Sequence, residues 1–505
     1  MASAAGGVVT TSGGAGAAST GGTVSNGGAA PAGGGGAASS GGTISNGGAT
    51  PASGGSSSSG GAPTGTGGAT GSGGKAAVPA CGDGNVDSGE SCDDKNLANG
   101  DGCSSSCRSE ATDIQLGHEF GCAILGDGRL KCWGNGASGQ LGTGDLSARG
   151  DAAGEMGTTL PVTLRGVTLL VAGRAHACAV SSGELYCWGD NSKGQLGLGV
   201  TYTTPVTTPT KVSFALGAPI KSLTSFYDHT CAILSTGALA CWGDNARGQL
   251  GTGDLVMQPS TTGQALTPVA LGDAAVSVAT GSNFTCAALA SGAVKCWGDN
   301  TRGALGLGLT YNALHAETYP TNAVDLGPNF RSTFVSAGTN NCALGSAGSI
   351  KCWGNASAGL GYDSAVSIGT DPTQMGVALP NVPLSSVVKQ LASGWFENCV
   401  VLAAGEVECF GGAVRGMIGR ADYGNTGQST NLGDEPGEMS TLYPLPLGGK
   451  ARLVRVGRDF ACALLETGQI KCWGQNNVGQ LGQGSNLDQG DNEGETAALA
   501  PTVVD

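Results

Sequence analysis

The stretch CAILSTGALACWGDNARGQLGTGD, residues 231–254, holds two cysteines with nine residues between them, then Trp-Gly and a glycine-rich tail. Taken alone, this arrangement fits a zinc loop, a redox motif or a disulfide-bonded β-hairpin. The same arrangement recurs along residues 112–505. The recurrence narrows the choice, because the chemistry assigned to one copy has to suit all of them.

The motif occurs seven times, at a period of roughly 53 to 63 residues, which indicates a repeat array. Nine residues separate the two cysteines of a copy, except in the second copy, where eight do. The pairs are Cys122 and Cys132, Cys178 and Cys187, Cys231 and Cys241, Cys286 and Cys296, Cys342 and Cys352, Cys399 and Cys409, and Cys462 and Cys472. The aromatic residue before the following glycine is Trp133, Trp188, Trp242, Trp297, Trp353, Phe410 or Trp473.

Each copy predicts about four short strands and no helix. TCAILSTGALACWG (230–243) is typical of two strands around a glycine-containing turn. The apolar runs LTPVAL (266–271) and VSVAT (276–280) supply two more strands ahead of the next hairpin. Four-stranded units repeated seven times predict an all-β fold, a seven-bladed β-propeller.

The two ends of the array indicate how the ring closes. The first copy begins near Ile114 without a preceding Pro-x-Val segment, and APTVVD (500–505) supplies such a segment with no hairpin after it. We therefore expect the C-terminal strand to complete the blade that begins near Ile114, so that the propeller is closed by the C-terminal strand.

The pattern G-x-x-H-x-C-A followed by C-W-G-D-N-x-x-G-Q-L-G strongly resembles the regulator of chromosome condensation repeat. The resemblance covers about 390 residues and implies a seven-bladed propeller. The opening glycine is Gly117, Gly173, Gly281, Gly394 or Gly457, whereas the third copy has Phe226. The family's histidine is matched by His176 and His229 and replaced by Phe120, Phe284, Asn340, Glu397 and Phe460. This variation within one chain indicates a packing residue and not a catalyst.

The cysteine pairs are expected to form disulfides within the blades. Directly opposed residues of antiparallel strands lie within disulfide reach. Zinc would require C-x-x-C clusters or added histidines, and the chain has four histidines in all. Buried free thiols and a metal are the alternatives.

Residues 81–107, CGDGNVDSGESCDDKNLANGDGCSSSC, are too few for a hydrophobic core. Two disulfides among Cys81, Cys92, Cys103 and Cys107 are expected, with the connectivity open. The segment resembles a myxobacterial-type cysteine-rich repeat, which implies an exported bacterial protein.

A calcium site is the alternative for this segment. Asp83, Asn85, Asp87 and Asp94 occupy positions 1, 3, 5 and 12 of an EF-hand-like loop, but Ser88 stands where that loop has glycine. We prefer solvated turn carboxylates and expect no other cofactor.

Residues 1–80 are rich in Gly, Ala, Ser and Thr, and Lys75 is their only charged residue. This composition predicts a disordered spacer, with an adhesive or glycosylated stalk as the alternative. The expected domains are therefore the tail (1–80), a cysteine-rich module (81–110) and the propeller (111–505).

The start of the chain lacks the basic and apolar regions of a signal peptide. Eighteen cysteines nevertheless favour an oxidising compartment, and we give them more weight. The expected location is extracellular, periplasmic or at the cell surface.

The net charge of −14 argues against a nucleic-acid partner. We expect no transmembrane segment and a monomer. The Gly-Gln-Leu-Gly tails lack the Lys-Ser/Thr of a phosphate loop, and Asn191, Asn245 and Asn300 are expected to cap turns.

Three related loops form the candidate binding surface: GDAAGEM (150–156), GDEPGEM (433–439) and GDNEGET (490–496). They belong to copies one, six and seven, which are adjacent in a closed ring. Their carboxylates could therefore present a surface to a cation or a basic partner. The surface consists of Asp151, Glu155, Asp434, Glu438, Asp491 and Glu495. In the alternative interpretation, these side chains only cap a recurring turn.

The sequence contains no G-x-S-x-G or H-E-x-x-H motif and nominates no Ser/His/Asp set. We therefore expect a non-catalytic, exported or cell-surface module that binds an unidentified protein or acts as a scaffold. An extracellular hydrolase or lyase with a carboxylate-based site on one propeller face is the alternative.

Overall fold

The computed structural model describes residues 81–259, 261–308, 318–423 and 431–505. All of them lie in the second of the two units into which the chain divides, residues 74–505. The tail predicted for residues 1–80 falls outside the described residues.

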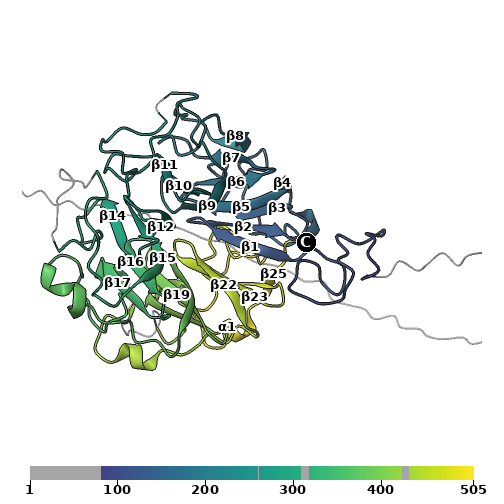
Figure 1. Cartoon of the computed structure of the whole chain (residues 1–505). Coiled ribbons are helices and arrows are strands. Elements are labelled where there is room, and N and C mark those ends of the chain that lie inside the picture. Colours follow the sequence, from purple (N-terminus) through teal and green to yellow (C-terminus); the bar gives the residue numbers. More distant parts are fainter. Residues whose placement is uncertain (1–80, 260, 309–317, 424–430) are drawn as a thin grey trace, which may run out of the picture. The chain divides into compact units, whose positions relative to one another are not determined.

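Seven antiparallel sheets surround a common axis, and the predicted all-β, seven-bladed propeller is confirmed (Figure 1). The innermost strands are β1 (Ala111–Leu116), β5 (Val167–Ala172), β9 (Ile220–Ser225), β12 (Ala275–Thr280), β15 (Ser332–Ala337), β18 (Val388–Ser393) and β22 (Ala451–Val456). The second strands are β2 (Phe120–Leu125), β6 (His176–Ser181), β10 (His229–Leu234), β13 (Phe284–Leu289), β16 (Asn340–Gly345), β19 (Glu397–Leu402) and β23 (Phe460–Leu465). The third strands are β3 (Leu130–Gly134), β7 (Glu184–Gly189), β11 (Leu239–Gly243), β14 (Val294–Gly298), β17 (Ile350–Gly354), β20 (Val407–Gly412) and β24 (Ile470–Gly474).

The second and third strands of each blade form the predicted hairpin, and the two cysteines of each copy lie directly opposite each other. In the third blade the Cα atoms of this pair are 4.0 Å apart. The blade disulfides, all as predicted, are Cys122–Cys132, Cys178–Cys187, Cys231–Cys241, Cys286–Cys296, Cys342–Cys352, Cys399–Cys409 and Cys462–Cys472. The chain has no free cysteine, so the zinc and free-thiol alternatives are excluded for these residues.

Each of the second cysteines lies on the third strand of its blade, one position before the recurring aromatic residue. These cysteines are Cys132, Cys187, Cys241, Cys296, Cys352, Cys409 and Cys472. All seven are buried, with at most 1% of each residue exposed. The disulfides therefore belong to the interior of the blades and offer no accessible thiol or metal ligand at the surface.

The fourth, outer strand belongs to the preceding hairpin, and our assignment of it to the following one is wrong. Within the described residues, four blades have such a strand: β4 (Val162–Leu164), β8 (Val206–Lys211), β21 (Asn431–Leu432) and β25 (Pro501–Thr502). In the third blade, the predicted strand 266–271 reaches β11 through one backbone bond, from Val269 N to Leu239 O, 2.8 Å. The chain leaves the end of the third strand, makes a long excursion and returns along that strand's free edge.

The C-terminal strand consequently lies in the last blade and not, as expected, in the first. β25 pairs with β24, Ile470 opposite Thr502. The two ends of the array still meet, because the Asp505 carboxylate lies 2.8 Å from Arg129 Nη1 and accepts a bond from Ser109 N at 3.1 Å. One core cluster also combines Ile114 of the first blade with Phe460 of the last.

The recurring aromatic position packs between neighbouring blades. The six tryptophans of the motif are completely buried. Each donates its indole N–H to a backbone carbonyl in the tail of the preceding blade; the bond from Trp188 to Gln140 O is 2.8 Å long. Trp133 of the first blade donates to Gln480 O of the seventh at 3.0 Å, so the pattern continues across the junction of the ends.

The strand register distinguishes two faces of the propeller. In the first blade Leu116 pairs with Gly121 and Ala111 with Leu125, so loop 117–119 and the hairpin turn 126–129 lie at opposite ends of the sheet. We refer to these two ends of the ring as the loop face and the turn face. The cysteine-rich module contacts the turn face, where Gly126 N donates to Glu110 O (2.9 Å) and Arg452 Nη1 donates to Gly100 O (3.1 Å).

Candidate functional site

Four aromatic rings from three different blades meet on the axis of the propeller at the loop face. The His118 ring lies 5.1 Å from Trp395, 5.4 Å from Tyr227 and 5.5 Å from Phe226, measured between centroids. These residues follow β1, β9 and β18, the innermost strands of the first, third and sixth blades. We name His118, Phe226, Tyr227 and Trp395 the aromatic plug, because they span the ring at this end.

His118 is the most enclosed polar member of the plug. Its side chain is 6% exposed, and Nε2 has no hydrogen-bond partner among the described residues. Burial, helped by the nearby Arg458 and Arg174 charges, lowers the pKa of His118 to about 3. The imidazole is therefore neutral at physiological pH and packs as an aromatic ring.

Two arginines flank the plug. The guanidinium of Arg174 lies 5.2 Å from the Tyr227 ring, and that of Arg458 lies 5.3 Å from the Trp395 ring. Arg174 Nε is also 2.8 Å from Asp228, and Arg458 Nε is 3.5 Å from Asp459.

The pKa values of Asp228 and Asp459 are both raised. Burial raises them, and this effect outweighs the adjacent guanidinium groups, which lower them. The carboxylates thus fix the direction of the two cations. The rings of Tyr227 and Trp395, which are partly exposed, remain at the surface.

Sequence reasoning missed this cluster. The second position of the G-x-x-H motif is His118, Arg174, Tyr227, Ser282, Thr339, Trp395 or Arg458 in successive copies. A repeat comparison looks for what the copies share and passes over such a position. The available signal was that this position, which directly follows a glycine in six of the seven copies, changes its chemistry from copy to copy.

The glutamates of the acidic loops have a structural role, because each accepts hydrogen bonds from the backbone of its own loop. Glu438 Oε2 accepts bonds from the backbone N–H groups of Gly433, Asp434 and Glu435, at 2.8 to 3.0 Å. Glu155 and Glu495 accept equivalent bonds in their own loops. In the fifth blade, Gln374 Oε1 does the same for residues 369–371. A neutral side chain can therefore fill this role.

The loops also pack on the tail of the preceding blade. A Cβ atom added to Gly150 would lie 3.0 Å from Gly479 O, and one added to Gly490 would lie 3.2 Å from Gly419 Cα. Loop 150–156 therefore packs on the tail of the seventh blade and loop 490–496 on the tail of the sixth, while a shared acidic surface stays a prediction. Asp151 and Glu155 interact directly: burial and the Glu155 carboxyl raise the pKa of Asp151.

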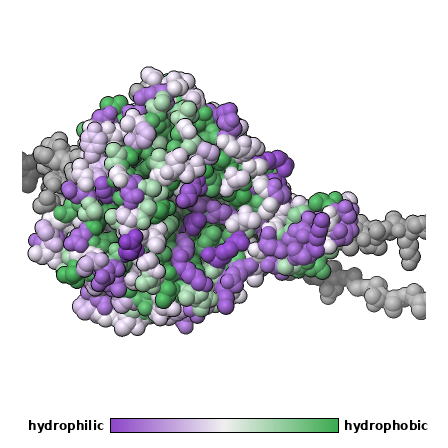
Figure 2. Space-filling view, viewed as in Figure 1, coloured by the Kyte–Doolittle hydropathy of each residue, from purple (hydrophilic) through white to green (hydrophobic). Residues whose placement is uncertain are grey.

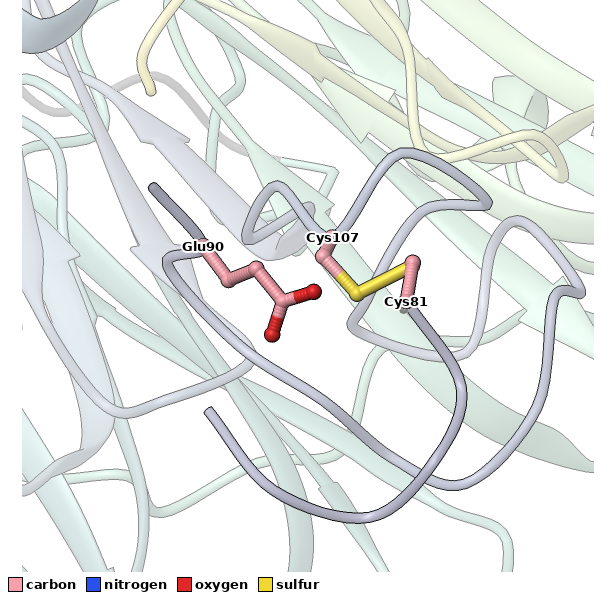
Figure 3. A group of neighbouring side chains, drawn as sticks. All are labelled: Cys81, Glu90 and Cys107. Atoms are coloured by element: carbon pink, nitrogen blue, oxygen red, sulfur yellow. A yellow bond between two sulfur atoms is a disulfide. The ribbon is translucent and has the colours of Figure 1, made fainter. Parts of the chain in front are cut away.

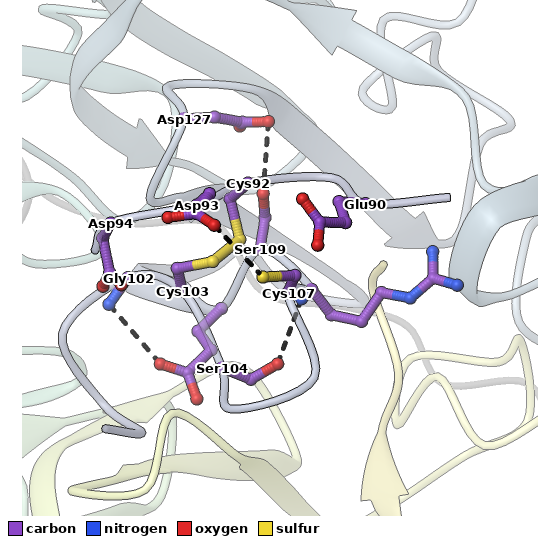
Figure 4. The surroundings of a disulfide bond; sticks show 12 residues. Glu90, Cys92, Asp93, Asp94, Gly102, Cys103, Ser104, Cys107, Ser109 and Asp127 are labelled. Atoms are coloured by element: carbon purple, nitrogen blue, oxygen red, sulfur yellow. Dashed lines mark hydrogen bonds between the residues drawn. A yellow bond between two sulfur atoms is a disulfide. The ribbon is translucent and has the colours of Figure 1, made fainter. Parts of the chain in front are cut away.

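The cysteine-rich module contains the two expected disulfides, Cys81–Cys107 and Cys92–Cys103. Around the second of them, Gly102 N donates to Glu110, Ser109 Oγ to Asp127 and Arg108 N to Ser104 Oγ (Figure 4). Asp93 accepts backbone N–H bonds from Gly82, Asp83, Gly84 and Lys95, which makes it the turn carboxylate that organises the segment.

The candidate calcium ligands are not gathered around one point. Among the described residues, one group of three metal-ligating side chains lies together, Cys81, Glu90 and Cys107 (Figure 3). Its two cysteines form a disulfide, so neither can act as a thiolate ligand. Asp83 instead accepts bonds from the backbone and side-chain nitrogens of Asn85, at 2.9 and 3.2 Å. Calcium binding by Asp83, Asn85, Asp87 and Asp94 stays a prediction without geometric support.

The family histidines pack between blades. His176 Nε2 lies 3.0 Å from Thr230 Oγ1 of the next blade, and His229 Nε2 lies 2.8 Å from Thr285 Oγ1. Burial lowers their pKa values to about 4 and about 3.

In the sixth blade Glu397 replaces this histidine, and its next-blade counterpart is Ala461 in place of threonine. The Oε1 atom of Glu397 has no hydrogen-bond partner among the described residues, and burial raises the pKa of Glu397 well above its usual range.

Comparison with known proteins agrees with this geometry. Two sequence profiles, both described as the regulator of chromosome condensation (RCC1) repeat, match the chain. One matches residues 182–233, and the other matches 111–140, 167–195, 227–249, 275–304 and 452–480. RCC1 repeats are thus found in the first to fourth and the seventh copies. The resemblance inferred from the motif is thereby confirmed.

Among curated relatives, the ultraviolet-B receptor UVR8 of Arabidopsis thaliana is 30% identical, covering 57% of this chain and 61% of the receptor. The secretion-regulating guanine nucleotide exchange factor of Bos taurus is 27% identical, covering 71% of this chain and 76% of that protein. A probable E3 ubiquitin-protein ligase, HERC6 of Homo sapiens, is covered over 19% of its length. The RCC1-repeat chain thus spans less than two thirds of the receptor and of the ligase.

Solved structures show the same fold. Human WBSCR16 superposes with a TM-score of 0.57 at 18% identity, over 74% of this chain and 94% of that one. Prp20p of Saccharomyces cerevisiae gives 0.54 at 21% identity, over 70% of this chain and 81% of that one. No helix in the part of the chain that the structure describes has the length and apolar character needed to cross a bilayer.

Proposed function

We propose that this RCC1-repeat propeller is an exported or cell-surface module that binds a protein partner and carries out no catalysis itself. The proposal rests on the residues exposed at the centre of the loop face. There Tyr227 and Trp395 are partly exposed between Arg174 and Arg458, whose side chains are 36% and 44% exposed.

This combination of residues suits a protein interface. Trp, Tyr and Arg are the residue types that most often dominate binding energy at the centre of such interfaces. The ion pairs to Asp228 and Asp459 hold the guanidinium groups in place before any partner arrives. Less side-chain freedom is then lost on binding, which favours affinity.

The disulfides support the proposed location. All 18 cysteines are paired, seven pairs in the blades and two in the module. Disulfides persist in oxidising compartments and are rare in the cytosol. An exported protein is the simplest context for so many bonds.

The similar proteins support a binding role in a general way. Their names include a receptor and an exchange factor, and the report of the Prp20p structure concerns its binding to Gsp1p and histones. The acidic loops extend the proposed surface outward. Asp151, Asp434 and Asp491 would contact basic groups of the partner at its rim, where charges act mainly on the association rate.

Affinity capture from the surface fraction of the producing cell tests this function. The native propeller is expected to retain a protein that the Trp395→Ala/Arg458→Ala variant loses by at least tenfold. Val377→Ala is the matched control, because Val377 is 86% exposed and lies outside the loop-face centre. Equal capture by native protein and the double variant would refute the assigned surface, and no captured protein at all would refute the binding function.

A further inference from the structure

A channel of about 400 Å³ runs along the propeller axis between the innermost strands of the blades. Phe226 of the aromatic plug lines it, so the plug closes the channel at the loop face. A molecule would therefore enter from the turn face. Figure 2 shows a hollow near the centre of the ring, with hydrophilic side chains around it.

The channel wall is rich in hydroxyl and amide groups. Its polar residues include Ser222, Thr224, Ser277, Ser336, Gln115 and Gln390. Hydroxyls and amides both donate and accept hydrogen bonds, so they match the hydroxyl groups of a carbohydrate. The volume lies in the range of small-molecule sites, which spans about 300–1,000 Å³.

Two hydroxyls of this wall lack a protein partner. Thr280 Oγ1 and Ser393 Oγ are buried, with 1% and 7% of their residues exposed, and neither has a hydrogen-bond partner among the described residues. Buried polar groups are nearly always satisfied in native proteins. Because both atoms are enclosed by the surrounding protein, a molecule in the channel would reach them only after a change of side-chain rotamer.

Of the described residues, one charged side chain lines the channel. Arg455 Nη2 lies 3.3 Å from Asp113 of the neighbouring first blade, and its side chain is 27% exposed. A guanidinium can bind a carboxylate through two parallel hydrogen bonds. Lys221 and Lys389 lie one residue nearer the turn face than the lining residues Ser222 and Gln390, and both lysines are exposed. These two lysines lie on the turn-face side of the lining residues, and Asp113, paired with Arg455, is an acidic group of the same region.

We propose that the axial channel binds an acidic sugar, with Arg455 holding its carboxylate and the serine and threonine side chains holding its hydroxyls. Phe226 and Phe334 also line the channel and offer ring surfaces to the apolar face of a sugar ring. The site lies apart from the loop-face surface and does not depend on a protein partner.

Saturation-transfer NMR and calorimetry on the full disulfide-bonded chain test the site, with D-galacturonate as the probe. Galacturonate is expected to bind, with galactose and acetate at least tenfold weaker. Galactose lacks the carboxylate and acetate lacks the hydroxyls. Equal binding of either control, or no galacturonate binding at about 10 mM, would overturn the proposal.

Two variants locate the bound sugar. Arg455→Gln is expected to weaken galacturonate binding at least tenfold, and Ser222→Leu to abolish it by narrowing the channel. Arg452→Gln is the matched control: it removes the same charge from the same strand, but Arg452 donates to backbone carbonyls of Gly100, Ala111 and Thr112. Undiminished binding in Arg455→Gln, or an equal loss in Arg452→Gln, would contradict the assignment. Circular dichroism checks that each variant is folded.

Discussion

At the scale of single residues, the sequence predicts the turn caps that recur in each copy. It does not predict the aromatic plug, which residues of different copies form together. The turn caps are confirmed: the Oδ1 atoms of Asn191, Asn245 and Asn300 accept the backbone N–H of the residue five positions later. Such caps depend on local geometry, which a short motif encodes. The aromatic plug depends on residues more than a hundred positions apart meeting on the axis, and a local pattern holds no information on that meeting.

Glu397 provides a test at this scale. Its pKa is raised in the folded protein, so the folded state holds a proton that the unfolded state has released above about pH 4.5. Stability is therefore lost as the pH rises from this value towards the folded pKa. Glutamine imitates the protonated side chain. Glu397→Gln is expected to unfold at the native temperature near pH 4 and about 2–5 °C higher at pH 8, by calorimetry.

Glu408 is the control for this experiment. It is also fully buried in the sixth blade, but Ser385 donates to it through Oγ at 2.5 Å and through N at 3.4 Å. Because its charge is hydrogen-bonded, Glu408→Gln should bring no gain at pH 8. A gain in both variants, or in neither, would show that the missing partner of Glu397 has no influence on stability.

At the scale of the blade, strand composition and cysteine spacing predicted the hairpins and their disulfides. The outer strand was assigned to the wrong hairpin, because order along the chain does not tell whether a segment pairs backward or forward. In the first blade Leu130 of β3 pairs with Leu164 of β4, across the whole excursion between them. β4 pairs with β3 because the outer edge of β3 is unpaired in the folded blade. The sequence alone does not tell which strand edges are unpaired.

The disulfides give the prediction at this scale. Native protein treated with an alkylating reagent is expected to gain no label, and reduced, unfolded protein to gain 18, because every cysteine is paired in the structure. Intact mass spectrometry counts the labels. Labelling of several cysteines in the native protein would contradict both the blade disulfides and the proposed export.

At the scale of the whole molecule, the seven-fold period predicted the propeller, since seven like units each need a neighbour on both sides. The period could not predict which face binds. The proposed surface and the proposed channel site rest on differences between copies, such as Trp395 and Tyr227 on the loop face and Arg455 in the channel. The sequence drew attention to the acidic loops, whose glutamates cap turns, because charged motifs stand out in a one-dimensional comparison.

Each tryptophan of the motif contacts the preceding blade, and this contact also joins the first blade to the last, so the blades form a closed ring. Since Trp133 reaches Gln480 as Trp188 reaches Gln140, the junction of first and last blade is built like the five other junctions that carry a tryptophan. The backbone of Ser109, two residues before β1, also lies beside Asp505. A circular permutant that joins these ends by a short glycine linker and opens the chain between β3 and β4 should fold with all seven blade disulfides. Its near-ultraviolet circular dichroism should match that of the native protein; an unfolded permutant would mean that one junction matters more than the others. Evolution could then have lengthened, shortened or reordered such a ring one blade at a time, with no blade holding a privileged place.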